Sequence, residues 1–329
     1  MPWRRSPTPY HVWISEIMLQ QTRVSAATAY YERFMEALPD VKALAEVPEE
    51  ELFKLWEGLG YYSRARNLKK AAKELVERRG GRLPASREEL LSLPGIGSYT
   101  AGAIASIAFG IPAPAVDGNV LRVVSRILES REDIAKPPVK KQMEALIAGV
   151  IPEGRAGDFN QSLMELGALV CVPNGEPKCG LCPLRELCLT YLHGTADQIP
   201  VKTRGKARKC EERTVFAVER GGAVLLSKRP DQGLLAGLYE FPNAPGRLSG
   251  PESLNYLGIP GEAVLSLEAM PKAKHIFTHV EWRMTGWRIL LKETGWEPEA
   301  GRFASLSEAK ERYPLPGAFK AYAAVVFGK

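Results

Sequence analysis

Apolar residues recur with the spacing of α-helices through the first 195 residues of the chain. In the first such segment, residues 9–22, the side chains of Val12, Trp13 and Leu19 lie three or four positions from Glu16 and share its face. The first part of the chain is therefore predicted to be all-α. The same spacing predicts further helices through most of 27–80, up to Leu91, from Ser98, over 119–150 and over 159–170.

The pattern changes after residue 192. Residues 196–213 are polar and basic without periodicity, which predicts a linker. Residues 214–218 and 223–227 flank a Gly-Gly pair as a β-hairpin, 282–292 alternate like a strand, and a helix is expected near 316–327. We therefore predict a helical domain over 1–195, a basic linker over 196–213 and an α+β domain over 214–329.

Composition and charge indicate the cellular compartment of the protein and the kind of partner it binds. The 329 residues are 45% hydrophobic and 25% charged, and the formal net charge of +6 favours an acidic partner such as nucleic acid without proving one. The chain does not open with a signal-peptide pattern, and the longest apolar run, 101–116, is short for a bilayer and contains Pro112 and Pro114. We expect a cytoplasmic protein with no membrane partner.

Four of the five cysteines form a C-x7-C-x2-C-x5-C array. Disulfides are rare in a reducing compartment, so these thiols predict a metal site. Either a tetrahedral zinc ion or an iron–sulfur cube could be enclosed, and the spacing does not choose between them. The fifth cysteine, Cys210, falls in the predicted linker and has no expected role. The members of the array are Cys171, Cys179, Cys182 and Cys188.

Glu16 is the first candidate for chemistry. A carboxyl group among apolar neighbours has a raised pKa and can stay protonated, as a general acid must. The alternative is a surface glutamate at the edge of its helix.

A second candidate is the turn LPGIG at 93–97, which contains Leu93, Gly95 and Gly97. Its glycines allow a tight bend that points backbone N–H groups outward at a helix N-terminus, a geometry that suits a DNA phosphate. Asp117 follows about twenty residues later, ahead of another helix. The alternatives are an ordinary helix–helix turn and an ordinary helix N-cap.

Aromatic and basic residues also meet at the turn GLGYY, 58–62, which precedes a basic helix. Rings can wedge between bases while cations hold phosphates. Core tyrosines beside a solvated basic helix are the alternative.

Together these motifs resemble the helix-hairpin-helix DNA glycosylases with an iron–sulfur cluster, most closely the adenine DNA glycosylases of the MutY type. Nearly the whole chain is covered, and the motifs keep the order and spacing of the family. They are PWR at 2–4, SEIMLQQT at 15–22, WEGLGYYSRARNL at 56–68, LPGIGSYTAGAI at 93–104, VDGNV at 116–120, ELGALVC at 165–171, GLLAGLYEFP at 233–242 and FTH at 277–279.

The resemblance implies hydrolysis of the N-glycosidic bond of adenine mispaired with 8-oxoguanine or guanine in duplex DNA. The adenine must be flipped out of the helix to be reached. Glu16 would protonate the leaving adenine, and Asp117 would stabilise the oxocarbenium-like sugar or bond to it transiently. Tyr99 and Asn119 would support these two carboxyl groups.

The remaining roles also come from the resemblance. Trp3 and Arg4 would line the adenine pocket, with Gln161 beside it where some relatives have glutamate. Gln21 and Tyr61 would wedge into the base stack beside 8-oxoguanine. The 277–279 loop, consisting of Phe277, Thr278 and His279, would contact that base, although Thr278 stands where the family more often has serine.

The cysteine array would then hold a structural [4Fe-4S] cluster. The family usually has six residues between the first two cysteines, so the seven at 172–178 predict a bulged loop. The second domain resembles the NUDIX fold without its G-x5-E-x7-R-E-x2-E-E carboxylates, which predicts a recognition module. One active site per chain makes a monomer the simplest expectation.

Two other functions compete. Endonuclease III-like glycosylase-lyases acting on oxidised pyrimidines share the cluster, but they carry a lysine where this chain has Tyr99, and a phenol cannot form an imine. A DNA-binding module without activity would use the hairpin and the cluster alone. The presence of both Glu16 and Asp117 argues against it.

Overall fold

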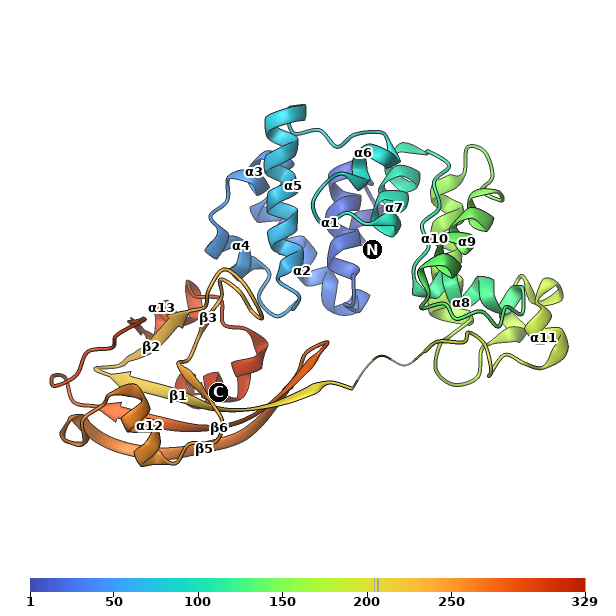
Figure 1. The fold of residues 1–329 in the computed structure, drawn as a ribbon. Coiled ribbons are helices and arrows are strands. Elements are labelled where there is room, and N and C mark those ends of the chain that lie inside the picture. Colours follow the sequence, from blue (N-terminus) through green and yellow to red (C-terminus); the bar gives the residue numbers. More distant parts are fainter. Residues whose placement is uncertain (204, 206, 329) are drawn as a thin grey trace. The chain divides into compact units, whose positions relative to one another are not determined.

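The structure, a computed structural model, describes residues 1–203, 205 and 207–328, which group into two compact units (Figure 1). The helical unit comprises Met1–Glu46 and Arg66–Gly205, and the sheet unit comprises Val47–Ala65 and Lys206–Lys329. The fold class predicted from the sequence, a helical domain followed by an α+β domain, is confirmed. Residues 47–65 group with the sheet unit, whereas the sequence placed them in the helical domain.

Long-range polar contacts link 47–65 to the rest of the sheet unit. Its helix α4, Glu49–Leu55, carries Glu50, whose Oε1 accepts hydrogen bonds from Lys228 Nζ at 2.8 Å and Tyr239 Oη at 2.9 Å. Two turns further on, Glu57 Oε1 accepts the backbone N–H of Leu315 at 2.8 Å. These partners are more than 170 residues away, so periodicity could not have identified them.

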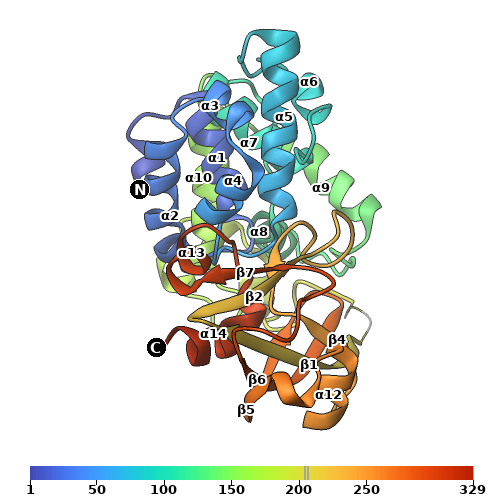
Figure 2. The same ribbon diagram turned by 90° about the vertical axis from the view of Figure 1, so that its left-hand side faces the viewer.

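The helical unit is built around α7, which contacts α1, α6 and α10. Gly102 allows α7 to approach the segment that leads to Asp117, because a Cβ there would lie 1.9 Å from the carbonyl oxygen of Pro114. The helices in chain order are α1 (Pro9–Leu19), α2 (Val24–Ala37), α3 (Val41–Glu46), α5 (Ser63–Arg79, which begins in the sheet unit), α6 (Arg87–Leu91), α7 (Ser98–Phe109), α8 (Gly118–Ile127), α9 (Pro137–Ala148), α10 (Ala156–Glu165) and α11 (Leu189–His193) (Figure 2).

The helix predicted over 159–170 is interrupted. α10 ends at Glu165, and Leu166–Val170 continue as a π-helical turn that leads into Cys171. Gly167 packs here against Asn119, with room for no side chain, since a Cβ would lie 2.6 Å from the Cβ of Asn119. None of the described helices is both long and apolar enough to cross a membrane.

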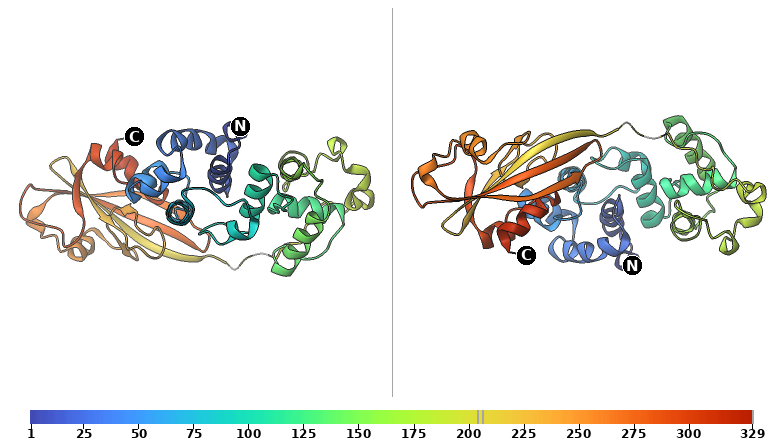
Figure 3. Two further views of the ribbon diagram at one scale, coloured as in Figure 1. Left: turned by 90° about the horizontal axis from the view of Figure 1, so that it is seen from above. Right: turned by 90° about the horizontal axis from the view of Figure 1, so that it is seen from below.

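The sheet unit contains a mixed sheet with the order β3-β2-β1-β6-β5. Figure 3 shows the ribbon from two further directions. β1 and β2 form the predicted hairpin, and β1 runs parallel to β6 along most of its length. β4 pairs with β1, and β7 pairs with β2. The strands are β1 (Lys209–Arg220), β2 (Ala223–Lys228), β3 (Tyr239–Glu240), β4 (Asn243–Pro245), β5 (Val264–Ile276), β6 (Val280–Leu291) and β7 (Arg302–Ser305).

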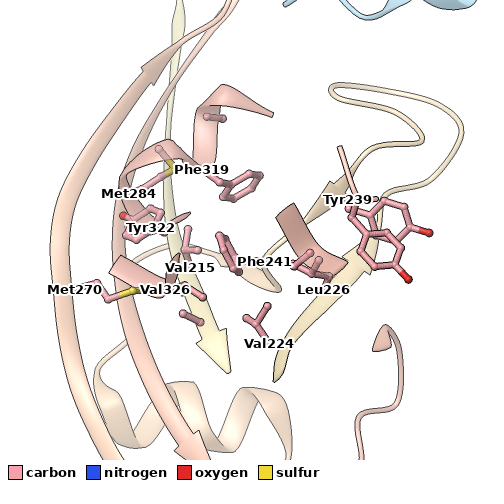
Figure 4. Close-up of a cluster of buried hydrophobic side chains, with 14 of the residues drawn as sticks. Val215, Val224, Leu226, Tyr239, Phe241, Met270, Met284, Phe319, Tyr322 and Val326 are labelled. Carbon is pink, nitrogen blue, oxygen red and sulfur yellow. The ribbon is translucent and has the colours of Figure 1, made fainter. Parts of the chain in front are cut away.

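Alternation along β1 assigns its side chains to two cores. Val215 joins the cluster shown in Figure 4, where Tyr322 and Val326 of α14 (Lys320–Phe327) pack on the sheet. Phe216 joins the opposite cluster, which packs against α12 (Gly250–Leu257). Helices therefore cover both faces of the sheet, and the predicted C-terminal helix is α14. A short helix, α13 (Leu306–Glu311), follows β7.

The predicted linker over 196–213 is too long at its C-terminal end. β1 begins at Lys209, and Lys209 to Glu212 pair in register with Val280 to Arg283. These β1 residues are mostly exposed and polar, so they lack the apolar alternation by which a strand is recognised. Cys210 is exposed within this strand.

Candidate active site and cysteine loop

Two residues far apart in the sequence, Glu16 and Tyr99, meet in the helical unit. Glu16 of α1 is only 8% exposed. Tyr99 of α7 donates its phenolic hydrogen to Glu16 Oε2 at 2.5 Å and lies 3.4 Å from the sulfur of Met164. The buried position predicted for Glu16 is confirmed, and the surface alternative is wrong.

Burial is the main reason why the pKa of Glu16 lies above the ordinary range, and the negative charge of Asp117 raises it further. The hydrogen bond from Tyr99 and the charge of Arg4 oppose this rise. Burial and the neighbouring Glu16 also raise the pKa of Tyr99, so its hydroxyl keeps its proton and acts as a donor. The surroundings of Glu16 therefore favour its protonated form to a higher pH than is usual for a glutamate.

Asp117 lies at the N-cap of α8. Its Oδ1 accepts the backbone N–H of Val120 at 2.8 Å, and its Oδ2 accepts the side-chain amide of Asn119, also at 2.8 Å. The first turn of α8 and the Asn119 side chain therefore hold this carboxyl group in one orientation. The N-cap interpretation is correct, and it is compatible with chemistry because the same carboxylate acts electrostatically on Glu16.

Arg122 connects this carboxylate to the cysteine loop. Its Nη2 donates to Asn119 Oδ1 at 2.8 Å and to the carbonyl of Gly167 at 2.7 Å, while its Nε donates to the carbonyl of Cys171 at 2.8 Å. Asn119 in turn donates to Asp117. One guanidinium group thus orients both the residue beside Asp117 and the first cysteine of the array.

Asn160 of α10 fixes the chain just before Asp117. It is fully buried, and its Oδ1 accepts the backbone N–H of Ala115 at 3.1 Å. Its Nδ2 donates to the carbonyl of Ala113 at 2.8 Å and to Ser106 Oγ at 2.9 Å. Because all these partners are buried, the segment entering α8 has a single well-defined path.

The four cysteines of the array line one small cavity of about 30 Å³. Burial and the neighbouring thiols raise the pKa of the Cys179 thiol. Arg126 of α8 also lines this cavity and donates from Nη1 to Cys171 Sγ at 3.3 Å and to the carbonyl of Val172 at 3.1 Å. The loop over 172–178, between the first two cysteines, is closed by the backbone hydrogen bond from Lys178 N–H to Val170 O at 3.0 Å.

The residues predicted to line the adenine pocket lie in the same helical unit. Trp3 is buried, with its ring edge-on to Tyr31 at 5.3 Å between centroids. Arg4 forms an ion pair with Glu165. Gln161 of α10 donates to the carbonyl of Gly157 at 3.2 Å, within its own helix. Arg4 is connected to the acid through its electrostatic effect on Glu16.

The turn at 93–97 bends tightly just before α7. Gly95 has φ +78°, and a Cβ there would lie 2.6 Å from that of Asn67. Gly97 is the N-cap of α7 and supplies no side-chain cap, so the N–H groups of the first turn are available to an external anion. Leu93 is buried and anchors the turn.

Two residues predicted to reach into the base stack have unusual backbones. Gln21, beyond the end of α1, has φ +57°, and Tyr61 has φ +48°. Both lie in the left-handed region that residues other than glycine rarely adopt, and Tyr61 is 48% exposed. Such strain is typical of residues held for function.

Tyr61 meets the 277–279 loop within the sheet unit. Thr278 Oγ1 donates to Tyr61 Oη at 3.5 Å. The loop is closed by the bond from Phe277 N–H to Val280 O at 2.8 Å, and the carbonyl of His279 accepts from Lys209 N–H at 3.0 Å. The structure thus brings together two motifs separated by over 200 residues.

Several residues of the site were missed by the sequence analysis. They are Gly102, Arg122, Arg126, Asn160 and Gly167, each of which acts through a backbone carbonyl, a buried amide or a close approach. A glycine or arginine inside a helix was the available signal, but the long-range partners described above lie 12 to 54 residues away.

The fold and the site define a class, the DNA glycosylases of base excision repair. Residues 14–149 match the family described as "HhH-GPD superfamily base excision DNA repair protein", and residues 214–324 match "NUDIX domain". Within this class, the chain belongs to the adenine DNA glycosylase family. The resemblance stated from the sequence is confirmed.

Three curated relatives illustrate the match. Adenine DNA glycosylase of Buchnera aphidicola subsp. Acyrthosiphon pisum is 32% identical over 85% of this chain and 79% of its own length. The relative from subsp. Baizongia pistaciae is 37% identical over 74% and 68%. The mouse enzyme is 36% identical over 85% of this chain. The chain spans 66% of the length of the mouse relative and 54% of the human one.

Two solved structures resemble part of the chain. A thermostable thymine-DNA glycosylase has a TM-score of 0.53 and 32% identity, covering 59% of this chain and 88% of that one. Endonuclease III in a non-covalent complex with DNA has a TM-score of 0.50 and 29% identity, covering 58% and 85%.

Proposed function

We propose that this chain is a monofunctional DNA glycosylase that removes adenine mispaired with 8-oxoguanine or guanine in duplex DNA. The observation that carries the proposal is the buried Glu16 carboxyl group, whose pKa is raised and which accepts a hydrogen bond from Tyr99. Adenine is a poor leaving group as an anion, so its departure requires an acid that is still protonated at neutral pH.

Glu16 gives its proton to a ring nitrogen of the flipped adenine as the bond to C1′ of the sugar breaks. The electron pair of that bond leaves with the adenine. Tyr99 keeps the carboxyl group oriented by donating to Oε2, which leaves the other oxygen to carry the proton. Trp3, Arg4 and Gln161 are assigned to the adenine pocket.

Asp117 stabilises the positive charge that develops on the sugar, or bonds to it transiently. Its carboxylate is held by Val120 N–H and by Asn119, so little reorganisation is needed when the charge appears. Water then adds to C1′ and returns a proton to the site, which completes the hydrolysis. This division of work between two carboxyl groups parallels glycoside hydrolysis.

The base opposite the adenine is assigned to Gln21, Tyr61 and the 277–279 loop. The hydrogen bond between Thr278 and Tyr61 supports a shared contact surface for that base. The turn formed by Leu93, Gly95 and Gly97 is assigned to a DNA phosphate. A monomer located in the cytoplasm, at the nucleoid, is the accompanying proposal.

The lyase alternative is disfavoured by Tyr99. Opening a sugar by β-elimination requires an amine that forms a Schiff base at C1′, and a phenol cannot supply one. Tyr99 is instead committed to Glu16 by a short hydrogen bond.

Single-turnover base release tests the proposal. Duplexes carrying adenine opposite 8-oxoguanine, guanine and thymine are incubated with the full chain and then treated with alkali to reveal abasic sites. We expect alkali-dependent cleavage at adenine opposite 8-oxoguanine and guanine, and none opposite thymine. Cleavage without alkali, or stoichiometric trapping of protein on DNA by borohydride, would contradict a monofunctional enzyme.

We also propose that Cys171, Cys179, Cys182 and Cys188 hold a [4Fe-4S] cluster. The donor set fits, because the four thiols share one cavity and the Arg126 guanidinium beside Cys171 can balance the negative charge of a thiolate-bound cluster. The resemblance to the iron–sulfur glycosylases favours the cluster over a single zinc ion. The bound cluster supplies a rigid cross-link for the loop that Arg122 connects to Asp117.

Protein purified without oxygen should contain about four iron atoms and about four acid-labile sulfides per chain. Replacing Cys182 by serine should remove most of the iron and its visible absorbance, because one thiolate ligand is removed. Cys210→Ser is the matched control and should keep both, since Cys210 is exposed on β1. Zinc without sulfide would contradict the cluster.

A further inference from the structure

The sheet unit contains a basic pocket that none of the proposed roles uses. It is a cavity of about 310 Å³ at the end of β5 and β6 that leads into the 277–279 loop. Thr285 lines the pocket, and its hydroxyl oxygen lies 3.5 Å from that of Thr214 on β1. Thr214 is two residues before Phe216 and so points to the same side of the sheet, where the cluster of Phe216 packs against α12. The pocket therefore opens on the face covered by α12. Its charged lining consists of Arg247, Lys272, Lys274 and Arg283.

The strand register makes this lining electrostatically unfavourable in the free protein. Lys274 lies directly opposite Arg283 in the β5–β6 pair, and like charges in facing positions destabilise a sheet. A register shift between Met270 and Ala273 bulges β5 and adds Lys272 to the same cavity. The fold thus places several positively charged side chains close together, although they repel one another.

The carboxylates around the pocket do not neutralise it. Arg247 pairs with Glu212 at 2.9 Å, and Arg283 pairs with Glu281, also at 2.9 Å. No ion pair to Lys272 or Lys274 is found among the described residues. Four cations against two carboxylates leave an excess of positive charge inside a concave site, which is the arrangement that concentrates anions.

We propose that this pocket binds a backbone phosphate of the DNA strand that carries the 8-oxoguanine or guanine. The assignment rests on the proposed function, because it uses the role of the 277–279 loop beside that base. The pair Lys274–Arg283 lies two residues beyond the pair Ile276–Glu281 that borders the loop, or roughly 7 Å at about 3.3 Å per residue. One DNA strand places a phosphate about every 3.4 Å along the helix axis, so a phosphate lies within reach.

Salt-dependent binding of the full chain to duplex DNA tests this site. The double variant Lys274→Ala, Arg283→Ala should bind matched and mismatched duplexes more weakly, and the slope of log affinity against log KCl concentration should fall by about 1 for each phosphate that is no longer neutralised. The control Lys292→Ala, Arg312→Ala removes the same charge from exposed positions outside the pocket and should keep the wild-type slope. Equal slopes for the two variants would overturn the proposal.

Uncharged methylphosphonates identify the strand. Placed singly around 8-oxoguanine, one or two of them should weaken binding by the wild type and have no further effect on the pocket variant. The assignment would be overturned if the effect of a methylphosphonate depended on the pocket residues only in the adenine strand, or in neither strand. So would binding of free dGMP or inorganic phosphate to the pocket with an unchanged DNA slope, since the site would then take a free nucleotide.

Thermal unfolding separates binding from a structural role. Without DNA, the pocket variant should melt at the wild-type temperature or above it, because a like-charge pair has been removed. A lower melting temperature would mean that these cations stabilise the sheet. Adenine release by the wild type is measured separately. If no adenine is released but the pocket variant still has the smaller salt slope, the proposed function is wrong and the phosphate site is retained.

Discussion

Replacing Glu16 by glutamine should slow adenine release in a single turnover by about 100- to 10,000-fold, the range that general acid catalysis contributes. Glutamine has nearly the same shape, and its carbonyl oxygen can still accept the hydrogen bond from Tyr99. Its amide cannot protonate the leaving base. Binding of the mispaired duplex, measured by fluorescence anisotropy, should persist while base release is abolished or strongly slowed.

The matched control is Glu32→Gln on the exposed side of α2, which should release adenine at the wild-type rate. A Glu16→Gln variant that also kept this rate would remove Glu16 from the chemistry. Loss of both binding and release would instead point to a folding defect, which urea unfolding of the variant would reveal.

The pH dependence has a defined sign. Burial raises the pKa of Glu16, so the acid stays protonated above the ordinary range and the rate should fall as pH rises through the raised value. The contribution of Glu16 to the free energy of unfolding follows the same sign. It is fully present below the pKa of about 4.3 that a glutamate has in the unfolded chain, and it is lost as pH rises through the higher pKa of the folded protein. Glu16→Gln should therefore be at least as stable as the wild type at neutral pH, as urea unfolding would show.

Replacing Asp117 by asparagine should also lower the single-turnover rate by at least about 100-fold, because the charge that stabilises the sugar cation is removed. Asparagine is as good an N-cap as aspartate, so α8 should keep its first turn and the bond from Val120 N–H. The loss should appear in the base-release rate at saturating protein and not in the helical circular dichroism signal.

Asp158→Asn provides the control, since Asp158 is exposed on α10 and pairs with Arg155 three residues away. This variant should be as active as the wild type. An Asp117→Asn variant with unchanged base release would limit Asp117 to its capping role, the alternative left open by the sequence.

Local sequence patterns were sufficient to predict features that depend on interactions between residues close together in the chain. The apolar neighbours of Glu16 lie three or four positions away, so one turn of helix predicts its burial. The helix boundaries at Leu91 and Ser98 were read correctly because glycine and proline act on their own backbone. The hairpin between β1 and β2 followed from a two-glycine turn for the same reason.

Non-local partners were beyond such patterns. Residues 47–65 group with the sheet unit, and the partners of Glu50 and Glu57 in that unit lie far along the chain. The early start of β1 depends on pairing with β6, because its first residues are polar and exposed. The periodicity of one segment carries no information about the hydrogen-bond partners that a distant segment provides.

By itself, the sequence determined the two-domain class, the cysteine array, and the candidate acid and carboxylate, since these follow from residue type and spacing. The resemblance assigned Tyr99 to support a carboxyl group, and the structure gives its hydrogen bond to Glu16. The tertiary structure alone decided that Arg122 joins Asn119 to the cysteine loop and that Lys274 faces Arg283. The physical reason is that a pKa, a buried hydrogen bond and a basic pocket are properties of surroundings, and residues distant in sequence supply those surroundings only after the chain has packed.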